Sequence, residues 1–208
     1  MKGKTIKLGL SGEQLNYLKQ NGIVIFFIAL LITGYLGGII FASKGGSFIH
    51  NIADIFFDDF INIRLHGGYI NILISSLILS CIFLFINFIS GLSLIGMFFV
   101  SLSTLFKGML YGIIAGMMVN TYSFKGLLFY ICILLFPALI SSISLVFSGR
   151  RSIEFSGLLL SGVCRNGSVS IKDLKIYCLR HAVIFGFTFI SAVADMLLSC
   201  FFGRLFGL

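Results

Sequence analysis

Long blocks of apolar residues without a single charge dominate the chain. Each block approaches or exceeds the roughly 20 residues that an α-helix needs to cross the hydrocarbon core of a bilayer. The alternating segments of about 10 residues that build outer-membrane barrels are absent from the sequence. The pattern therefore predicts an all-α, polytopic membrane protein. The uncharged blocks are 20–43, 67–106, 108–124, 126–149 and 182–203, the last interrupted by Asp195.

Within these blocks we expect five membrane spans. Lysines precede the first span, as in a secretory signal peptide, but that span is longer than a signal-peptide core and shows no clear cleavage site, so we expect it to be retained. The expected spans are Ile23–Ala42, Tyr69–Ser90, about Thr104–Tyr122, Leu127–Phe147 and Ala182–Phe202. They give one membrane domain, 1–208, divided into a basic tail 1–22, four spans within 23–148, a basic connection 149–181 and a last span with a short tail 182–208.

Basic residues predict which ends of the spans face the cytoplasm, because short cytoplasmic loops are enriched in Lys and Arg. The tail 1–22 contains four such residues and the connection 149–181 contains six. The connection 43–68 contains only two, against three Asp residues. If both basic segments are cytoplasmic, four spans separate them and the C-terminus lies outside.

The same parity decides how the block 67–106 is divided. An even number of spans leaves Gly91–Leu105 as a re-entrant or interfacial half-helix on the cytoplasmic side, since its 15 residues are too few for a comfortable crossing. Lys107 would then lie about one turn inside the interface, and its long stem would carry the ammonium to water. A buried functional cation is the alternative role for this residue.

Gly108, Gly112 and Gly116 recur at every fourth position and predict a face for close helix packing. Residues four apart lie on one side of a helix, and glycine lets a second backbone approach closely. Gly34 and Gly38 have the same spacing in the first span. The partner of this face lies either in this chain or in another protein.

A few polar residues interrupt the spans. Asp195 lies in the last span, where a carboxylate costs about 2.5 to 3.5 kcal/mol on insertion scales, so it is a candidate site. A structural role, with the carboxylate bonded by Ser, Asn or an outer-loop amide, is the alternative. We do not pair Asp195 with Lys107, because the two are expected near opposite faces. Asn87 shares a face of the second span with Ser76 and Ser80, and these groups are expected to join helices through hydrogen bonds. Asn71 is a further polar residue of the same span, and Pro137 is expected to kink the fourth span.

Composition agrees with a membrane location and excludes several functions. Hydrophobic residues make up 58% of the chain and charged residues 11%, which leaves too little polar surface for a soluble domain. No catalytic motif accompanies the three His residues, and the five Cys residues lack the spacing of a zinc site or a disulfide framework. We therefore expect no enzyme activity, no catalytic residue, no cofactor and no bound metal. The basic tails favour the inner membrane surface over nucleic acid.

The second half of the connection 149–181 predicts a short interfacial helix. Ile171, Leu174 and Cys178 share one face of a helix over 170–181, and the Lys and Arg residues lie largely elsewhere. Such a helix lies in the interface with its basic residues toward anionic headgroups.

The order of these features resembles the stage II sporulation protein M family of bacterial membrane proteins, from about residue 20 to 205. Family members often have Asn-Gly where this chain has Lys107-Gly108, often have Glu at Asp195, and often have His-Gly after the proline, where this chain has Ala138. The resemblance rests on the basic tail and first span, Asn71 and Asn87, the Gly-rich segment 90–96, the segment 107–116, the Leu-Phe-Pro of 135–137 and Asp195.

The resemblance implies a non-enzymatic scaffold in the bacterial cytoplasmic membrane, which holds the peptidoglycan-degrading stage II sporulation proteins D and P during engulfment of the forespore. Its partners would be these proteins and the lipid bilayer, with a homo-oligomer as a further option. A triple-glycine face and little extramembrane mass suit such a helix-packing protein. A second hypothesis is a small transporter or permease subunit, with Gly91–Leu105, Lys107 and Asp195 lining its path.

Overall fold

The computed structural model describes residues 12–44, 59–64, 67–164 and 170–206, and this part of the chain is helical apart from short turns. A short helical segment, 59–64, follows the first long helix in the chain. The long elements are α1 (Gly12–Lys44), α3 (Tyr69–Gly91), α4 (Gly96–Phe129), the π-helical segment η1 (Tyr130–Leu134), α5 (Leu135–Cys164) and α6 (Ile171–Phe206). The all-α prediction is confirmed for the described residues.

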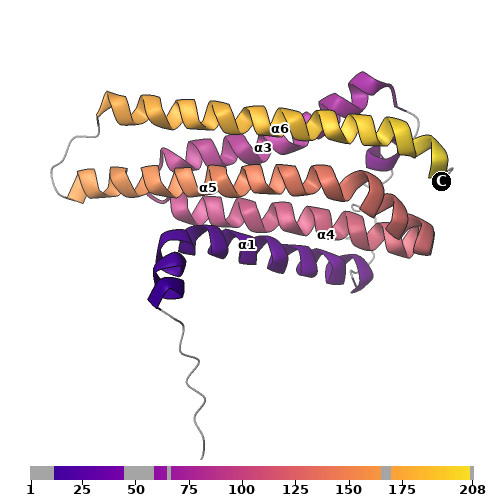
Figure 1. Cartoon of the computed structure of the whole chain (residues 1–208), viewed down its shortest axis with the longest axis horizontal. Coiled ribbons are helices and arrows are strands. Elements are labelled where there is room, and N and C mark those ends of the chain that lie inside the picture. Colours follow the sequence, from indigo (N-terminus) through magenta and orange to yellow (C-terminus); the bar gives the residue numbers. More distant parts are fainter. Residues whose placement is uncertain (1–11, 45–58, 65–66, 165–169, 207–208) are drawn as a thin grey trace, which may run out of the picture.

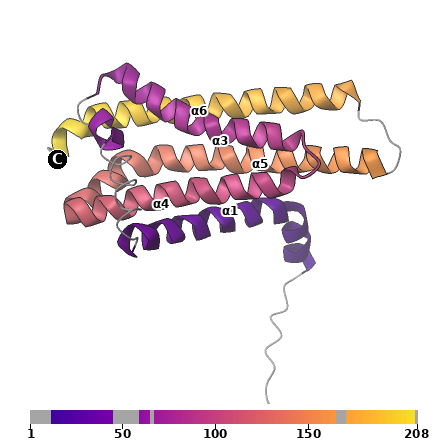
Figure 2. The ribbon, with the colours of Figure 1, turned by 180° about the vertical axis from the view of Figure 1, so that it is seen from behind.

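Four stretches are long and apolar enough to cross a membrane, which agrees with the predicted polytopic membrane protein. The third stretch is 67 residues long and contains α4, η1 and α5. These do not form one straight helix, because α4 and α5 lie side by side and run in opposite directions (Figures 1 and 2). The four stretches are Asn21–Lys44, Tyr69–Gly91, Gly96–Gly162 and Ile171–Phe202.

The reversal between α4 and α5 is centred on Ser123. Its backbone has φ 50° and ψ −128°, which is not helical and lies at a positive φ that favours glycine. Gly126 lies directly against the carbonyl oxygen of Met118, so the chain turns back tightly here. The third and fourth predicted spans are divided at this same point, between Tyr122 and Leu127.

The five long α-helices form an elongated bundle along a common axis (Figure 1). α4 and α5 occupy the middle, α3 and α6 pack together on one side, and α1 covers the other side, where it contacts mainly α4. The first turns of α1 bend away from the bundle (Figure 1). We call the end with the α3–α4 turn the His181 end and the end with Ser123 the Asp195 end.

The predicted half-helix over Gly91–Leu105 is wrong. A short turn over 92–95 joins α3 directly to α4, with Leu92 N–H bonded to Ile89 O at 3.0 Å and Gly96 N–H to Ser93 O at 3.2 Å. A side chain at Gly96 would overlap the carbonyl of Ser90, so glycine permits this tight reversal. The long uncharged block is therefore one complete span followed by the first turns of the next.

The predicted interfacial helix over 170–181 is also not a separate element. α6 begins at Ile171 and continues to Phe206. α5 likewise runs on to Cys164. The basic connection is therefore largely the ends of two long antiparallel helices.

Candidate functional site

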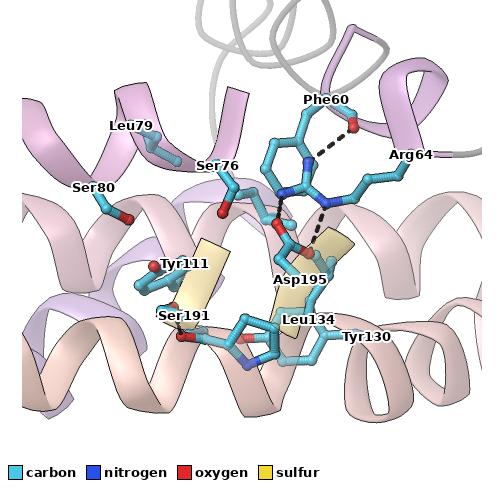
Figure 3. A pocket seen from close by; sticks show the side chains of 13 residues that line it. Phe60, Arg64, Ser76, Leu79, Ser80, Tyr111, Tyr130, Leu134, Ser191 and Asp195 are labelled. Atoms are coloured by element: carbon cyan, nitrogen blue, oxygen red, sulfur yellow. Dashed lines mark hydrogen bonds and ion pairs between the residues drawn. The ribbon is translucent and has the colours of Figure 1, made fainter. Parts of the chain in front are cut away.

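The clearest polar feature inside the bundle is an ion pair between Arg64 and Asp195. The Arg64 Nε donates to Asp195 Oδ1 at 3.3 Å and its Nη2 donates to Oδ2 (Figure 3). The Nη1 group donates to the carbonyl oxygen of Phe60 at 3.1 Å, and the guanidinium lies 3.4 Å from the centre of the Phe60 ring. The exposed fractions are only 4% for Arg64 and 2% for Asp195, so both ends of the pair are shielded from the surroundings.

The ion pair was not foreseen from the sequence, which suggested Ser, Asn or an outer-loop amide as the partner of Asp195. Arg64 belongs to the short helical segment 59–64, which brings it over α6 although 131 positions separate the two residues. One signal was available. Arg64 is one of only two Lys or Arg residues in a connection with three Asp residues, close to the expected outer end of the span that carries Asp195.

A cavity of about 20 Å³ lies beside the ion pair, among the segment 59–64, α3, α4, α5 and α6. Hydroxyl groups and the ion pair supply its polar surface, and Phe60, Leu79, Ile114 and Leu134 are among its apolar walls (Figure 3). A cavity of this size holds about one water molecule when polar partners surround it. The polar side chains that line it are Arg64, Ser76, Ser80, Tyr111, Tyr130, Ser191 and Asp195.

Lys107 lies next to this cavity, one hydroxyl group away from its wall. Its Nζ donates to the carbonyl oxygen of Ser141 at 3.2 Å and to the Ser141 hydroxyl at 2.5 Å. The Ser141 hydroxyl is 3.0 Å from that of Ser80, which lines the cavity. Lys107 and Asp195 are therefore connected through Ser141, Ser80 and the cavity.

The interpretation of Lys107 as an interface anchor is wrong. Its exposed fraction is 2%. Because α4 already begins at Gly96, Lys107 lies about 16 Å along the helix at 1.5 Å per residue, about three turns from its start rather than one. Its ammonium lies 5.8 Å from the centre of the Phe83 ring and 6.0 Å from that of Tyr111. Within the described ranges it forms no ion pair with a carboxylate.

A stripe of buried serines on α5 extends the polar interior toward the His181 end. Three of these side chains bond to backbone on α3, on α5 itself or on the α3–α4 turn: Ser152 to Asn87 O at 2.7 Å, Ser144 to Ile140 O and Ser156 to Ser93 O. Ser148 is fully buried and makes no hydrogen bond within the described part of the chain. The stripe consists of Ser141, Ser144, Ser148, Ser152 and Ser156, about one residue per turn.

Asn87 lies at the centre of this second half of the polar interior. Its carboxamide oxygen accepts a hydrogen bond from Ser103 on α4, and its Nδ2 donates to Leu145 O on α5 at 3.5 Å. Asn87 is fully buried and joins three helices. Asn71, the other asparagine that was expected inside the second span, is exposed in the first turn of α3.

Two aromatic residues of α6 close the His181 end of the polar interior. His181 Nε2 lies 3.4 Å from the Ser152 hydroxyl, and the Tyr177 hydroxyl donates to Phe88 O at 2.8 Å. The Tyr177 ring stacks on Phe155, with 4.5 Å between the ring centres. Polar groups therefore run from Arg64 and Asp195 through Lys107 to His181, and we call this series the polar track.

The predicted helix-packing glycines lie together between α1 and α4. A Cβ atom at Gly34 would overlap the backbone of Leu105, and one at Gly38 the backbone of Met109. From α4, Gly108 meets the backbone of Leu31, Gly112 that of Tyr35, and Gly116 the side chain of Ala42. The partner of the triple-glycine face is thus α1 of the same chain.

Pro137 lies in the first turn of α5, directly after the π-helical segment η1. Proline has no N–H to donate within a helix, and local widening is one way in which a helix adapts to this loss. The carbonyl oxygen of Pro137 accepts a hydrogen bond from Ser191 on α6 at 2.7 Å. The distortion thus lies beside the cavity, which Pro137 and Ser191 both line.

Comparison of the chain with protein-family models, with curated proteins and with solved structures yields no match. The chemistry must therefore be read from the site itself. Its components are one paired carboxylate, one paired guanidinium, one buried ammonium and a series of hydroxyl groups. Such groups can bind water or a small ion and can transfer protons, since every hydroxyl both donates and accepts hydrogen bonds.

Proposed function

We propose that this protein carries a small charged species, a proton or an inorganic ion, across the membrane along the polar track. The observation that carries the proposal is the burial of Arg64 and Asp195 at a water-sized cavity inside a membrane-spanning bundle, with Lys107 buried one hydroxyl group away from it. Ionisable groups in such a place are expensive and commonly belong to ion pathways and proton relays. The proposal takes up the transporter hypothesis of the sequence analysis.

Structural bonding alone is a weaker account of these residues. A buried ion pair contributes little stability compared with apolar residues of similar volume, because both charges lose their hydration. Lys107 gains even less, since its contacts within the described ranges are a carbonyl, a hydroxyl and two aromatic rings. The polar track also extends along the serine stripe over much of α5. A cross-link between two helices would require polar groups at one position only.

We further propose that the protein lies in a bacterial cytoplasmic membrane with its His181 end in the cytoplasm. The basic residues of the tail 1–22 and of the connection 149–181 support this orientation. Single cysteines at Ser43 and Ser161, both exposed at helix ends, test it in a cysteine-free chain. An impermeant thiol reagent added to intact cells should label the first and spare the second, and the reverse pattern would overturn the orientation.

Charge movement across a supported membrane tests the transport proposal. Purified protein in liposomes is exposed to rapid concentration jumps of inorganic ions and small organic ions, and the capacitive current is recorded. We expect a current with at least one solute or with a pH jump, and its loss in Lys107→Met and Asp195→Asn. Absence of current in every jump, from protein shown to be folded and monodisperse, would refute the proposal.

A scaffold related to stage II sporulation protein M is the second candidate. The triple-glycine face no longer supports it, because α1 occupies that face. Another feature does: an apolar groove of about 540 Å³ between α1 and α5, wide enough for side chains of a further membrane helix, opens on the surface of the bundle. The resemblance over 20–205 implies the sporulation proteins D and P as partners.

A photo-crosslinking residue at Ile143 tests this second candidate, because Ile143 lines the groove and is 56% exposed. Illumination in the native host should join the protein to a membrane protein, and the same residue at Ile78, on the exposed surface of α3, serves as the control. Products with lipid alone at both positions would contradict the scaffold.

A further inference from the structure

We propose that Lys107 and Asp195 exchange a proton through Ser141, Ser80 and one water molecule in the cavity. The inference rests on the proposed transport function and names the proton as the species that moves through the central part of the track. It is carried by geometry: Lys107 bonds to the Ser141 hydroxyl, that hydroxyl lies 3.0 Å from Ser80, and Ser80 and Asp195 line the same cavity.

The chemistry of the groups fixes one hydrogen-bond direction and permits the others. An ammonium has only donors, so the oxygen of Ser141 accepts from Lys107. Either hydroxyl can donate in the Ser141–Ser80 contact, and in the relay Ser141 donates to Ser80 and Ser80 donates into the cavity. In this arrangement the Ser80 hydroxyl is the donor at the end of the chain, and it donates to the group that occupies the cavity.

One water molecule completes the connection to the carboxylate. A cavity of about 20 Å³ is large enough, since a buried water needs roughly 10 to 15 Å³ and two to four polar partners. Ser76, Tyr111 and Ser191 supply further polar groups around it. Figure 3 shows these side chains and the ion pair around one space.

The transfer is balanced without any further reactant. A proton leaves the Lys107 ammonium for the Ser141 oxygen, the Ser141 proton moves to Ser80, the Ser80 proton moves to the water, and a water proton moves to Asp195. The products are a neutral amine and a neutral carboxyl group, and each hydroxyl keeps one proton. The return transfer restores both charges.

Other ionisable groups face the two ends of this path. Cys81 of α3 and Tyr111 of α4 face Lys107, while Arg64, Tyr111 and Tyr130 surround Asp195. Once Asp195 is neutral, Arg64 loses its ion-pair partner, and the tie between the segment 59–64 and α6 weakens.

Proton flux into liposomes tests the relay. Protein is reconstituted with a pH-sensitive dye inside, a potassium diffusion potential is imposed with valinomycin, and the initial rate of pH change is measured. We expect wild-type flux above that of protein-free liposomes and a decrease of about tenfold or more in Ser141→Ala, which removes the hydroxyl but leaves the carbonyl that also binds Lys107.

Two matched variants keep the result specific. Ser141→Thr retains a hydroxyl and should retain most of the flux, whereas Ser142→Ala, one residue away in the wall of the apolar groove, should equal wild type. Equal flux in Ser141→Ala and wild type would overturn the relay. Wild-type flux no greater than that of empty liposomes would also overturn it, and solute-driven currents in the same preparation would then leave the broader transport proposal standing.

Discussion

α4 has two different faces: one packs closely against α1, and the other carries polar side chains into the interior of the bundle. Toward α1, its glycines bring two backbones together, and the contact is dry and close. Toward α3 and α5, Ser103 donates to Asn87 and Lys107 donates to Ser141 in a buried interior that contains a cavity. Lys107 and Gly108 are neighbours in sequence but point about 100° apart around the helix, so they serve different faces. A membrane helix can thus combine tight packing with a polar lining, provided that the two lie on different sides.

The largest expected effect on stability concerns the Arg64–Asp195 ion pair in the polar interior. Asp195→Leu leaves the Arg64 guanidinium buried without its partner and should lower the free energy of unfolding by about 3 to 5 kcal/mol. Asp195→Asn should cost less, because the amide oxygen still accepts a hydrogen bond from Arg64. Thermal unfolding in mild detergent measures both. The double variant Arg64→Met with Asp195→Leu should recover most of the loss, and no recovery would show that the pair does more than balance two charges.

Substitutions on the glycine face of α4, which packs against α1, should lower the free energy of unfolding almost as much. Gly112→Leu must push α1 away from α4, because even a Cβ atom there overlaps the backbone of Tyr35. We expect a loss of at least about 1 to 3 kcal/mol, the usual cost of overpacking. Gly37→Leu is the matched control, since Gly37 has nothing within 4 Å and should tolerate the change. Similar melting temperatures for the two variants would mean that α1 does not pack through its glycines.

Substitution of Lys107 is expected to affect stability and charge movement differently. Lys107→Met removes a buried charge while keeping the length of the side chain, so stability should stay within about 1 kcal/mol of wild type or rise. Charge movement in liposomes should nevertheless be lost. Lys107→Arg should be less stable than either, because the larger guanidinium must fit a buried site. Retained activity in Lys107→Met would assign this residue to packing.

The smallest expected effect on stability concerns Ser148 of α5 and tests whether water reaches the polar interior of the bundle. Ser148 is buried without a hydrogen bond to the described residues. If water reaches it, Ser148→Ala should cost about 1 kcal/mol, the net worth of a typical hydrogen bond. Ser148→Ala should instead be neutral or stabilising if the site is dry, since the substitution then removes an unsatisfied hydroxyl. The melting temperature, compared with that of Ser142→Ala, distinguishes the two outcomes.

The membrane-spanning helices could be predicted from the amino-acid sequence alone. Their length and apolar character follow from the bilayer, which acts on each segment separately, so no knowledge of neighbours was needed. The glycine spacing likewise predicted a close-packing face, although only the folded chain shows that the face receives α1. Asp195 stood out as a candidate for the same reason: a charge in an apolar span is visible in the sequence.

The partners and the depth of the polar residues could not be predicted, because they depend on how the helices pack. The position of Lys107 depended on where α4 begins, and the α3–α4 turn at 92–95 moved that start by more than two helical turns from the prediction. The pairing of Arg64 with Asp195 joins residues 131 positions apart, and the cavity exists only when the segment 59–64 meets α3, α4, α5 and α6. Hydrophobicity acts along the chain, whereas ion pairs and cavities depend on distances between segments, and those distances are set only by packing.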